Sequence, residues 1–179
     1  MFSLGSVGHL FILSSFVFAI LSTISYFFAD NSKDKLDWYQ FGRLSFSLHS
    51  FFILASIVAL YMILLGNKFQ YYYAFQHTSS LLPIYFKISS FWEGQEGSFL
   101  LWMFWNVLVG TYFIFKPYSK WNASVIMVIS LVQSVLTSMV LGINLFDLKI
   151  GSSPFILLKD VISAPIFSID PNYVPEDGS

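Results

Sequence analysis

The spacing of charged residues constrains this chain most. Four stretches contain no Asp, Glu, Lys or Arg, and each can hold the roughly 20 apolar residues that cross a bilayer. They are residues 1–29, 44–67, 97–115 and 121–146. The chain is 56% hydrophobic and 11% charged, with mean hydropathy +0.68, whereas about a quarter of the residues in soluble proteins are charged. We therefore predict an all-α integral membrane protein with four transmembrane helices.

The predicted helices fall within a transmembrane region, residues 1–146. They cover about residues 7–28, 44–65, 97–115 and 121–146. The first is interpreted as a retained anchor, because it begins without a basic residue and no small-residue cleavage site precedes Asp30.

Basic residues indicate how the chain is oriented. They crowd the two short loops, with Lys33, Lys35 and Arg43 in the first and Lys116 and Lys120 in the third. Since short cytoplasmic loops are enriched in Lys and Arg, both loops are expected inside and the N-terminus outside.

Two external segments are expected on the outer side. The first, residues 66–93, has apolar residues at helical spacing and Pro83 where a first turn tolerates it, which predicts an interfacial helix over about 80–92. Its tyrosines, Tyr71 to Tyr73, together with Trp92 and Lys87, suit the interfacial layer, where an aromatic belt is a sufficient explanation. The second, residues 147–179, is rich in proline and acid and is interpreted as an external loop or tail that looks incomplete.

Polar residues inside the predicted helices have two explanations. Ser130, Ser134 and Thr137, with Gln133 beside them, form a stripe typical of close helix packing. His49 is a candidate intramembrane haem ligand or proton carrier. A hydrogen bond from its ring to a nearby serine or carbonyl explains it equally well.

Composition excludes several kinds of chemistry. Without cysteine, the chain has no disulfide, thiolate metal site or cysteine nucleophile, and a net charge of −1 with no basic cluster argues against nucleic acid. Its three separated histidines do not predict a metal site. Glu93 and Glu96 lack a nucleophile or metal partner, so catalysis by this chain alone is not expected.

The most distinctive segment, residues 91–105, reads Phe-Trp-Glu-Gly-Gln-Glu-Gly-Ser-Phe-Leu-Leu-Trp-Met-Phe-Trp. Gly94 and Gly97 permit a tight turn into the third transmembrane helix, while Glu96 and Ser98 are predicted to satisfy the free amides of its first turn. Trp102 and the following Trp105 are expected to pack against neighbouring helices or a flat macrocycle.

Residues 77–102 resemble the N-terminal region of CcmF-type cytochrome c haem lyases, the CcmF/CcsA family. That family has a similar Leu-Pro, an aromatic-basic turn, then Trp-Gly-x-x-Glu-Gly-Ser and Leu-Leu-Trp. Ser153-Pro154-Phe155 and Asp177-Gly178 resemble its next external loop. The motif positions carried over are Trp92, Gly94, Glu96, Gly97, Ser98, Leu101 and Trp102. This chain departs from the family at Glu93, commonly Gly, and at Gln95, often His, where an amide is a poor iron ligand.

The resemblance implies a part in attaching haem to the Cys-x-x-Cys-His segment of apocytochrome c on the outer face of a bacterial-type inner membrane. The implied partners are haem, apocytochrome c, other cytochrome c maturation membrane proteins and the bilayer. The family holds haem b through histidines of outer loops and later transmembrane helices, beside a tryptophan-rich loop, and none of these is present here. The chain is thus interpreted as an N-terminal membrane part that supports the haem platform without a catalytic residue.

Two alternatives remain open. In one, the chain is part of a membrane transporter, for which a broken helix would be expected. In the other, it is a structural subunit of a membrane redox complex, in which His49 would need a second histidine at similar depth. The haem pose, the electron donor and continuation past Ser179 are not indicated by the sequence.

Overall fold

The computed structural model describes residues 3–31, 34–117, 119–145, 148–162, 166–167, 170 and 173–177. Several positions used in the sequence predictions lie outside the described residues. They are Lys33, Asp147, Ala164, Pro165, Pro171, Gly178 and Ser179.

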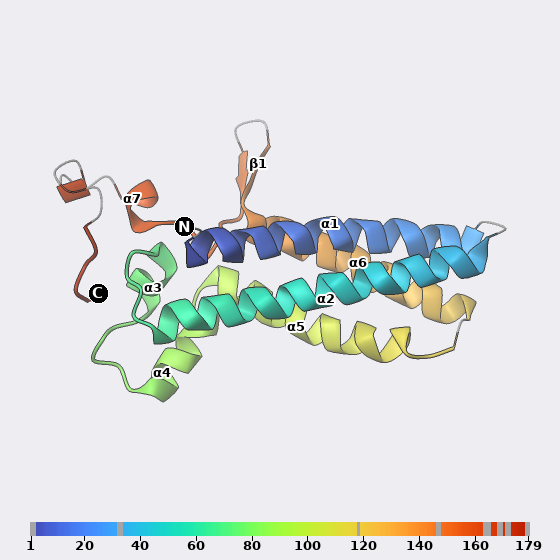
Figure 1. The fold of residues 1–179 in the computed structure, drawn as a ribbon, viewed down its shortest axis with the longest axis horizontal. Coiled ribbons are helices and arrows are strands. Elements are labelled where there is room, and N and C mark those ends of the chain that lie inside the picture. Colours follow the sequence, from blue (N-terminus) through green and yellow to red (C-terminus); the bar gives the residue numbers. More distant parts are fainter. Residues whose placement is uncertain are drawn as a thin grey trace.

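Four long helices form an antiparallel bundle (Figure 1). They are α1 (Leu4–Asn31), α2 (Lys35–Leu65), α5 (Gln95–Ile114) and α6 (Lys120–Leu141). All four have the length and apolar composition needed to cross a membrane. Helix α1 packs against α2 and α6, and α5 packs mainly against α6. The predicted all-α membrane class with four transmembrane helices is confirmed.

The observed helix ends differ from the predicted ones most at the start of α2 and at the end of α6. Helix α2 begins at Lys35, well before residue 44, because the charged residues of its first turns lie beyond the apolar stretch and can continue a helix in a polar layer. Helix α6 ends at Leu141, before residue 146. Gly142 follows it with φ +72°, a left-handed conformation that glycine adopts without strain and that ends helices.

Hydrogen bonds join the helices in the middle of the bundle. The hydroxyls of Ser22 and Ser130 lie 2.8 Å apart between α1 and α6, and the Gln133 amide donates to the Met103 carbonyl of α5 at 2.9 Å. Ser134 and Thr137 are also buried. The prediction that the polar stripe of α6 serves helix packing is confirmed.

The shorter helices gather at one end of the bundle, where α1 and α5 begin (Figure 1). We call this the loop-rich end and define it as residues 66–94, 151–162, 166–167, 170 and 173–177. It contains α3 (Tyr72–His77), α4 (Ile84–Ser89), a 3₁₀-helix η1 (Ser90–Trp92) and α7 (Leu158–Val161). The expected interfacial helix is therefore α4 with η1. Ile84, Tyr85 and Phe86 are exposed on it.

A short β-hairpin follows α6 and was not predicted. Strand β1 (Ile143–Leu145) pairs antiparallel with β2 (Leu148–Ile150), and Ile143 lies opposite Ile150. These residues were assigned to the end of a helix and to an irregular tail. The left-handed turn at Gly142 breaks the helical pattern and permits the pairing.

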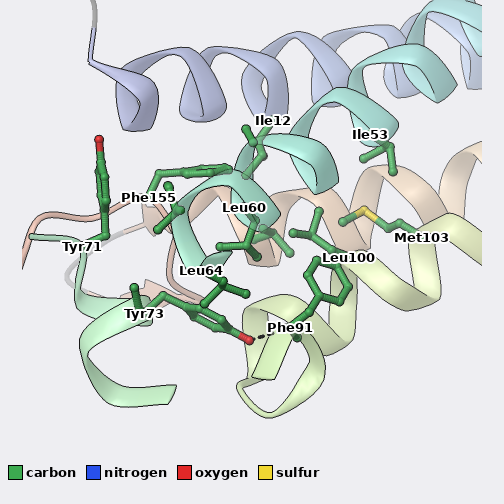
Figure 2. Close-up of a cluster of buried hydrophobic side chains, with 14 of the residues drawn as sticks. Ile12, Ile53, Leu60, Leu64, Tyr71, Tyr73, Phe91, Leu100, Met103 and Phe155 are labelled. Atoms are coloured by element: carbon green, nitrogen blue, oxygen red, sulfur yellow. Dashed lines mark hydrogen bonds between the residues drawn. The ribbon is translucent and has the colours of Figure 1, made fainter. Parts of the chain in front are cut away.

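The main apolar core lies where the bundle meets the loop-rich end (Figure 2). It joins Ile12, Leu60, Leu64 and Leu100 of the long helices to side chains from the loops. The loop residues are Tyr71, Tyr73, Phe91 and Phe155. The assignment of Tyr71 and Tyr73 to the interfacial layer is therefore wrong, because both rings are packed inside this core and are at most 3% exposed.

Lys87 is also buried instead of interfacial. Its ammonium donates to the Asn67 side-chain oxygen at 2.6 Å and contacts the Ser80 carbonyl at 3.5 Å. These acceptors replace the water that the lysine would otherwise need.

Candidate functional site at the start of helix α5

The Tyr73 hydroxyl organises the turn into α5. It donates to the Phe91 carbonyl at 2.8 Å and accepts a hydrogen bond from the Gly94 amide at 3.1 Å. The ring points from α3 toward η1, as Figure 2 shows. The Tyr73 hydroxyl thus satisfies two backbone groups at once. They are the amide of Gly94, just before α5, and the carbonyl of Phe91, in η1.

The two motif glycines are required by this close approach. A Cβ atom on Gly94 would collide with the Tyr73 ring and lie 2.8 Å from the His77 Nε2 atom. A Cβ atom on Gly97 would collide with the Phe91 carbonyl and the Tyr73 hydroxyl. Because a backbone carbonyl cannot move aside as a flexible side chain can, any larger residue at position 97 forces the turn apart.

The predicted positions of Ser98 and Glu96 are only partly matched. Glu96 lies in the first turn of α5, at the positive end of the helix dipole, but the N-cap residue is Gly94, which has no side chain with which to cap the helix. Ser98 instead donates from its hydroxyl to the Trp92 carbonyl at 2.8 Å, because its position in the second turn points back toward η1. Ser98 therefore fixes the turn before the helix, while the Tyr73 hydroxyl accepts from the Gly94 amide.

His77 lies against the motif, a contact that its place in an outer segment does not predict. Its ring packs on Tyr73 with centroids 4.6 Å apart. His77 and Glu93 line the same pocket of about 310 Å³, together with hydroxyl-bearing residues of the loop after α3, of α4 and of η1. The signal was present in the sequence, since Tyr73 and His77 are separated by four residues and lie on one face of a helix.

The electrostatics of the site keep Tyr73 protonated. Burial raises the pKa of the Tyr73 hydroxyl well above its ordinary value, and the nearby charges of Glu96 and Glu93 add to that rise. The phenol is therefore neutral at ordinary pH and donates its proton to the Phe91 carbonyl.

The C-terminal tail is joined to the same region. The Asp177 carboxylate accepts hydrogen bonds from the Ser79 hydroxyl and the Ser80 amide, both at 2.8 Å, and from the Ser80 hydroxyl at 3.1 Å. The loop between α3 and α4 is thus bound by the tail on one side. On the other side it contacts Lys87 through the Ser80 carbonyl.

The remaining motif residues differ in exposure. Leu101 packs partly against the main core. Trp92 is 46% exposed, and Trp102 and Trp105 are 56% and 59% exposed. The expectation that both tryptophans of α5 pack against neighbouring helices is not met among the described residues. They point outward because the adjacent positions Leu100 and Met103 fill the core side of the helix.

His49 is distant from the motif and enclosed by the bundle. Its Nδ1 atom lies 2.9 Å from the Ser15 hydroxyl and 3.0 Å from the Ser15 carbonyl, which confirms the expected hydrogen bond to a serine or carbonyl. Its Nε2 atom has no partner among the described residues, but the side chain is 0% exposed and packs on Phe46. A haem macrocycle does not fit at His49 in this arrangement. The described residues also contain no group of three or more metal-binding side chains.

Comparison with known proteins identifies one fold. No protein-family model and no curated protein matches this sequence. A solved structure described as cytochrome c haem lyase CcmF is similar, with a TM-score of 0.75 and 19% sequence identity over 96% of this chain. The chain spans 27% of the length of that protein. The resemblance seen in the sequence is confirmed at the level of structure: the chain has a CcmF-type fold.

Proposed function

We propose that this chain is the N-terminal membrane part of a cytochrome c haem lyase, which presents haem for covalent attachment to the Cys-x-x-Cys-His segment of apocytochrome c on the outer face of the membrane. A general role in cytochrome c biogenesis is supported by the CcmF-type fold over 96% of the chain. In this proposal the thiols come from the apocytochrome, which agrees with a chain that has no cysteine.

The observation that carries the proposal is the CcmF-type fold with the motif set at its loop-rich end. There the motif residues fall into two groups. Gly94, Gly97 and Ser98 hold the turn, whereas Trp92 and Trp102 leave their rings exposed. Exposed indole rings are suited to stack on a flat conjugated ligand or to contact a partner protein.

We further propose that this chain supports the haem platform while the ligands of haem b lie elsewhere in the complete protein. His49 is enclosed and hydrogen-bonded to Ser15, which favours a structural role for it. An N-terminus on the outer side of a bacterial-type inner membrane would place the loop-rich end with apocytochrome c and the other maturation proteins.

The test uses Trp102→Ala and Glu96→Ala in the longest natural product of the gene. Both are expected to lower the yield of holocytochrome c, measured by haem staining, at normal protein level in the membrane. Matched controls are Trp121→Ala, since Trp121 is 83% exposed, and Asp37→Ala. Trp121 and Asp37 lie in the first turns of α6 and α2, at the opposite end of the bundle. Equal yields in all four variants would show that Trp102 and Glu96 matter no more for haem attachment than residues at the opposite end of the bundle.

A spectroscopic measurement separates the proposal from its alternatives. Reduced-minus-oxidised spectra of this chain and of the longest product are expected to show a b-type haem in the longer product only. Haem bound by this chain alone would indicate that the helices around His49 rearrange and that His49 becomes an axial ligand of the haem iron. Haem in neither would favour a transporter part or a structural subunit of a redox complex.

A further inference from the structure

A groove lies beside the first turns of α1, away from the motif. It has a volume of about 530 Å³ and lies between α1, the end of α6 and the segment that leads into α7. Its polar side chains are Ser3, Ser6 and His9 at the α1 end, and Tyr71, Ser153 and Asp160 from other segments. The Tyr71 hydroxyl already accepts from the Gly5 amide at 2.8 Å. An adjoining apolar hollow of about 320 Å³ shares Ser6 and His9 with the groove.

The apolar hollow continues the groove along the outside of α1. It is lined by Val7, Leu10 and Leu13, one to two turns further into the helix. Leu10 and Leu13 are exposed. The two hollows together therefore offer a groove of mixed polar and apolar lining at the helix end and an apolar strip that runs away from it. This arrangement suits an amphiphile.

The position of the groove suits a lipid headgroup. With 28 residues, α1 is about 42 Å long at 1.5 Å per residue, whereas the hydrocarbon core is about 30 Å thick. Each end of α1 therefore reaches into the headgroup layer. For a helix centred in the core, the part beyond it at each end is about 6 Å long, or four residues. Ser3 and Ser6 lie in this part, His9 lies at its boundary with the hydrocarbon, and Leu13 lies at the level of the acyl chains.

The polar side chains match a headgroup with charges of both signs. The Ser3 and Ser6 hydroxyls lie 2.7 Å apart, so one of their two protons bonds the pair and the other remains available to a phosphate oxygen. His9 is exposed, and its Nδ1 atom lies 3.5 Å from the Ser153 hydroxyl. Its ring offers a further hydrogen bond.

Asp160 sets the charge of the groove. It is an exposed carboxylate, and no lysine or arginine lines the groove with it among the described residues. A purely anionic headgroup would therefore meet an uncompensated negative charge. A primary ammonium would pair with Asp160 while the adjacent phosphate reaches the serines.

We propose that this groove binds a phospholipid with a primary-amine headgroup, of the phosphatidylethanolamine class. The ammonium contacts Asp160, the phosphate accepts hydrogen bonds from the Ser3–Ser6 pair and His9, and an acyl chain covers Val7, Leu10 and Leu13. The site is independent of the proposed haem-related function.

Native mass spectrometry of the 179-residue chain in detergent tests the proposal. The chain is mixed with equal amounts of phosphatidylethanolamine, phosphatidylcholine and phosphatidylglycerol of the same acyl composition. The wild type is expected to retain phosphatidylethanolamine over phosphatidylglycerol by about fivefold, which is the ratio from about 1 kcal/mol for one partly exposed ion pair. Phosphatidylcholine, whose ammonium has no N–H to donate, is expected to bind more weakly than phosphatidylethanolamine.

Two carboxylate variants make the result specific. Asp160→Asn is expected to abolish the preference, whereas Glu176→Gln, an exposed carboxylate outside the groove, leaves it unchanged. His9→Ala is expected to weaken retention of phosphatidylethanolamine and phosphatidylcholine alike, because both contain the phosphate. Equal retention of the three lipids by the wild type, or an unchanged preference in Asp160→Asn, would overturn the proposal.

Discussion

Replacing Tyr73 with phenylalanine tests the central feature of the turn into α5. The substitution keeps the buried ring and removes only the hydroxyl. It leaves the Phe91 carbonyl without its donor and the Gly94 amide without its acceptor, and both are shielded by the core. Since each unsatisfied buried polar group costs about 1–3 kcal/mol, Tyr73→Phe is expected to lower the free energy of unfolding by about 2–4 kcal/mol.

The neighbouring tyrosine provides a matched control. The Tyr72 hydroxyl accepts a hydrogen bond from the Gln76 amide at 2.6 Å at an exposed position, where water replaces the lost partner. Tyr72→Phe is therefore expected to change stability by less than about 0.5 kcal/mol. Titration of both variants with sodium dodecyl sulfate in mixed micelles, followed by circular dichroism, gives the two free energies. Equal values for the two variants would refute the role assigned to Tyr73.

The pH dependence gives a second measurement on the same residue. The pKa of Tyr73 is raised in the folded protein, so its contribution to stability is fully present below the pKa of an unfolded tyrosine, about 10, and is lost as the pH rises above it. Wild-type stability is thus expected to fall more steeply above about pH 10 than that of Tyr73→Phe. Parallel curves for the two proteins would contradict the buried, neutral state of this phenol.

Three further substitutions have outcomes set by single contacts. Gly97→Ala places a methyl group against the Phe91 carbonyl and is expected to lower the free energy of unfolding by about 1–3 kcal/mol in the same titration. His49→Ala removes a fully buried ring and the partner of Ser15, so a loss of about 2–4 kcal/mol is expected, with an unchanged haem spectrum in the longest natural product. Asp177→Ala removes the acceptor of three hydrogen bonds from Ser79 and Ser80, and limited proteolysis is expected to cut the tail faster than in Glu176→Gln.

The membrane class and the number of long helices were predictable because they depend on the chain's own chemistry. A charge within the hydrocarbon layer is costly, so the uncharged stretches fix which segments can cross it. The interhelical role of Ser130 was predictable for a related reason, since a polar side chain inside the bilayer needs a hydrogen-bond partner. Ser134 finds one on its own helix, in the Ser130 carbonyl, whereas Ser130 bonds Ser22 of α1.

The environment of the loop-rich end was not predictable from local patterns. Tyr71, Tyr72 and Tyr73 are consecutive, and an aromatic residue near a membrane boundary suits both a headgroup layer and a protein core. Segments that are distant in the sequence decide which of these two environments each tyrosine occupies. Gly5 of α1 donates its amide to the Tyr71 hydroxyl, and Phe91 accepts from the Tyr73 hydroxyl, whereas Tyr72 remains half-buried.

The same reasoning explains why the motif was only partly interpreted. Gly94 and Gly97 were correctly associated with a tight turn, but the group that requires them is Tyr73, about 20 residues earlier in the chain. A sequence pattern shows that space is needed and does not show which side chain fills it. Ser98 and Glu96 have side chains that can cap a helix, but at the start of α5 the Gly94 amide donates to the Tyr73 hydroxyl instead.

This division of the motif determines which substitutions can reveal its function. A change at Gly97 or Ser98 disturbs the turn itself, so a loss of holocytochrome c yield in such a variant is explained by misfolding and says nothing about a binding surface. Trp102 is different, because its ring is more than half exposed and its removal leaves the core of the bundle intact. A lower yield in Trp102→Ala at normal protein level therefore requires a contact outside the described residues, whereas the same loss in Gly97→Ala does not.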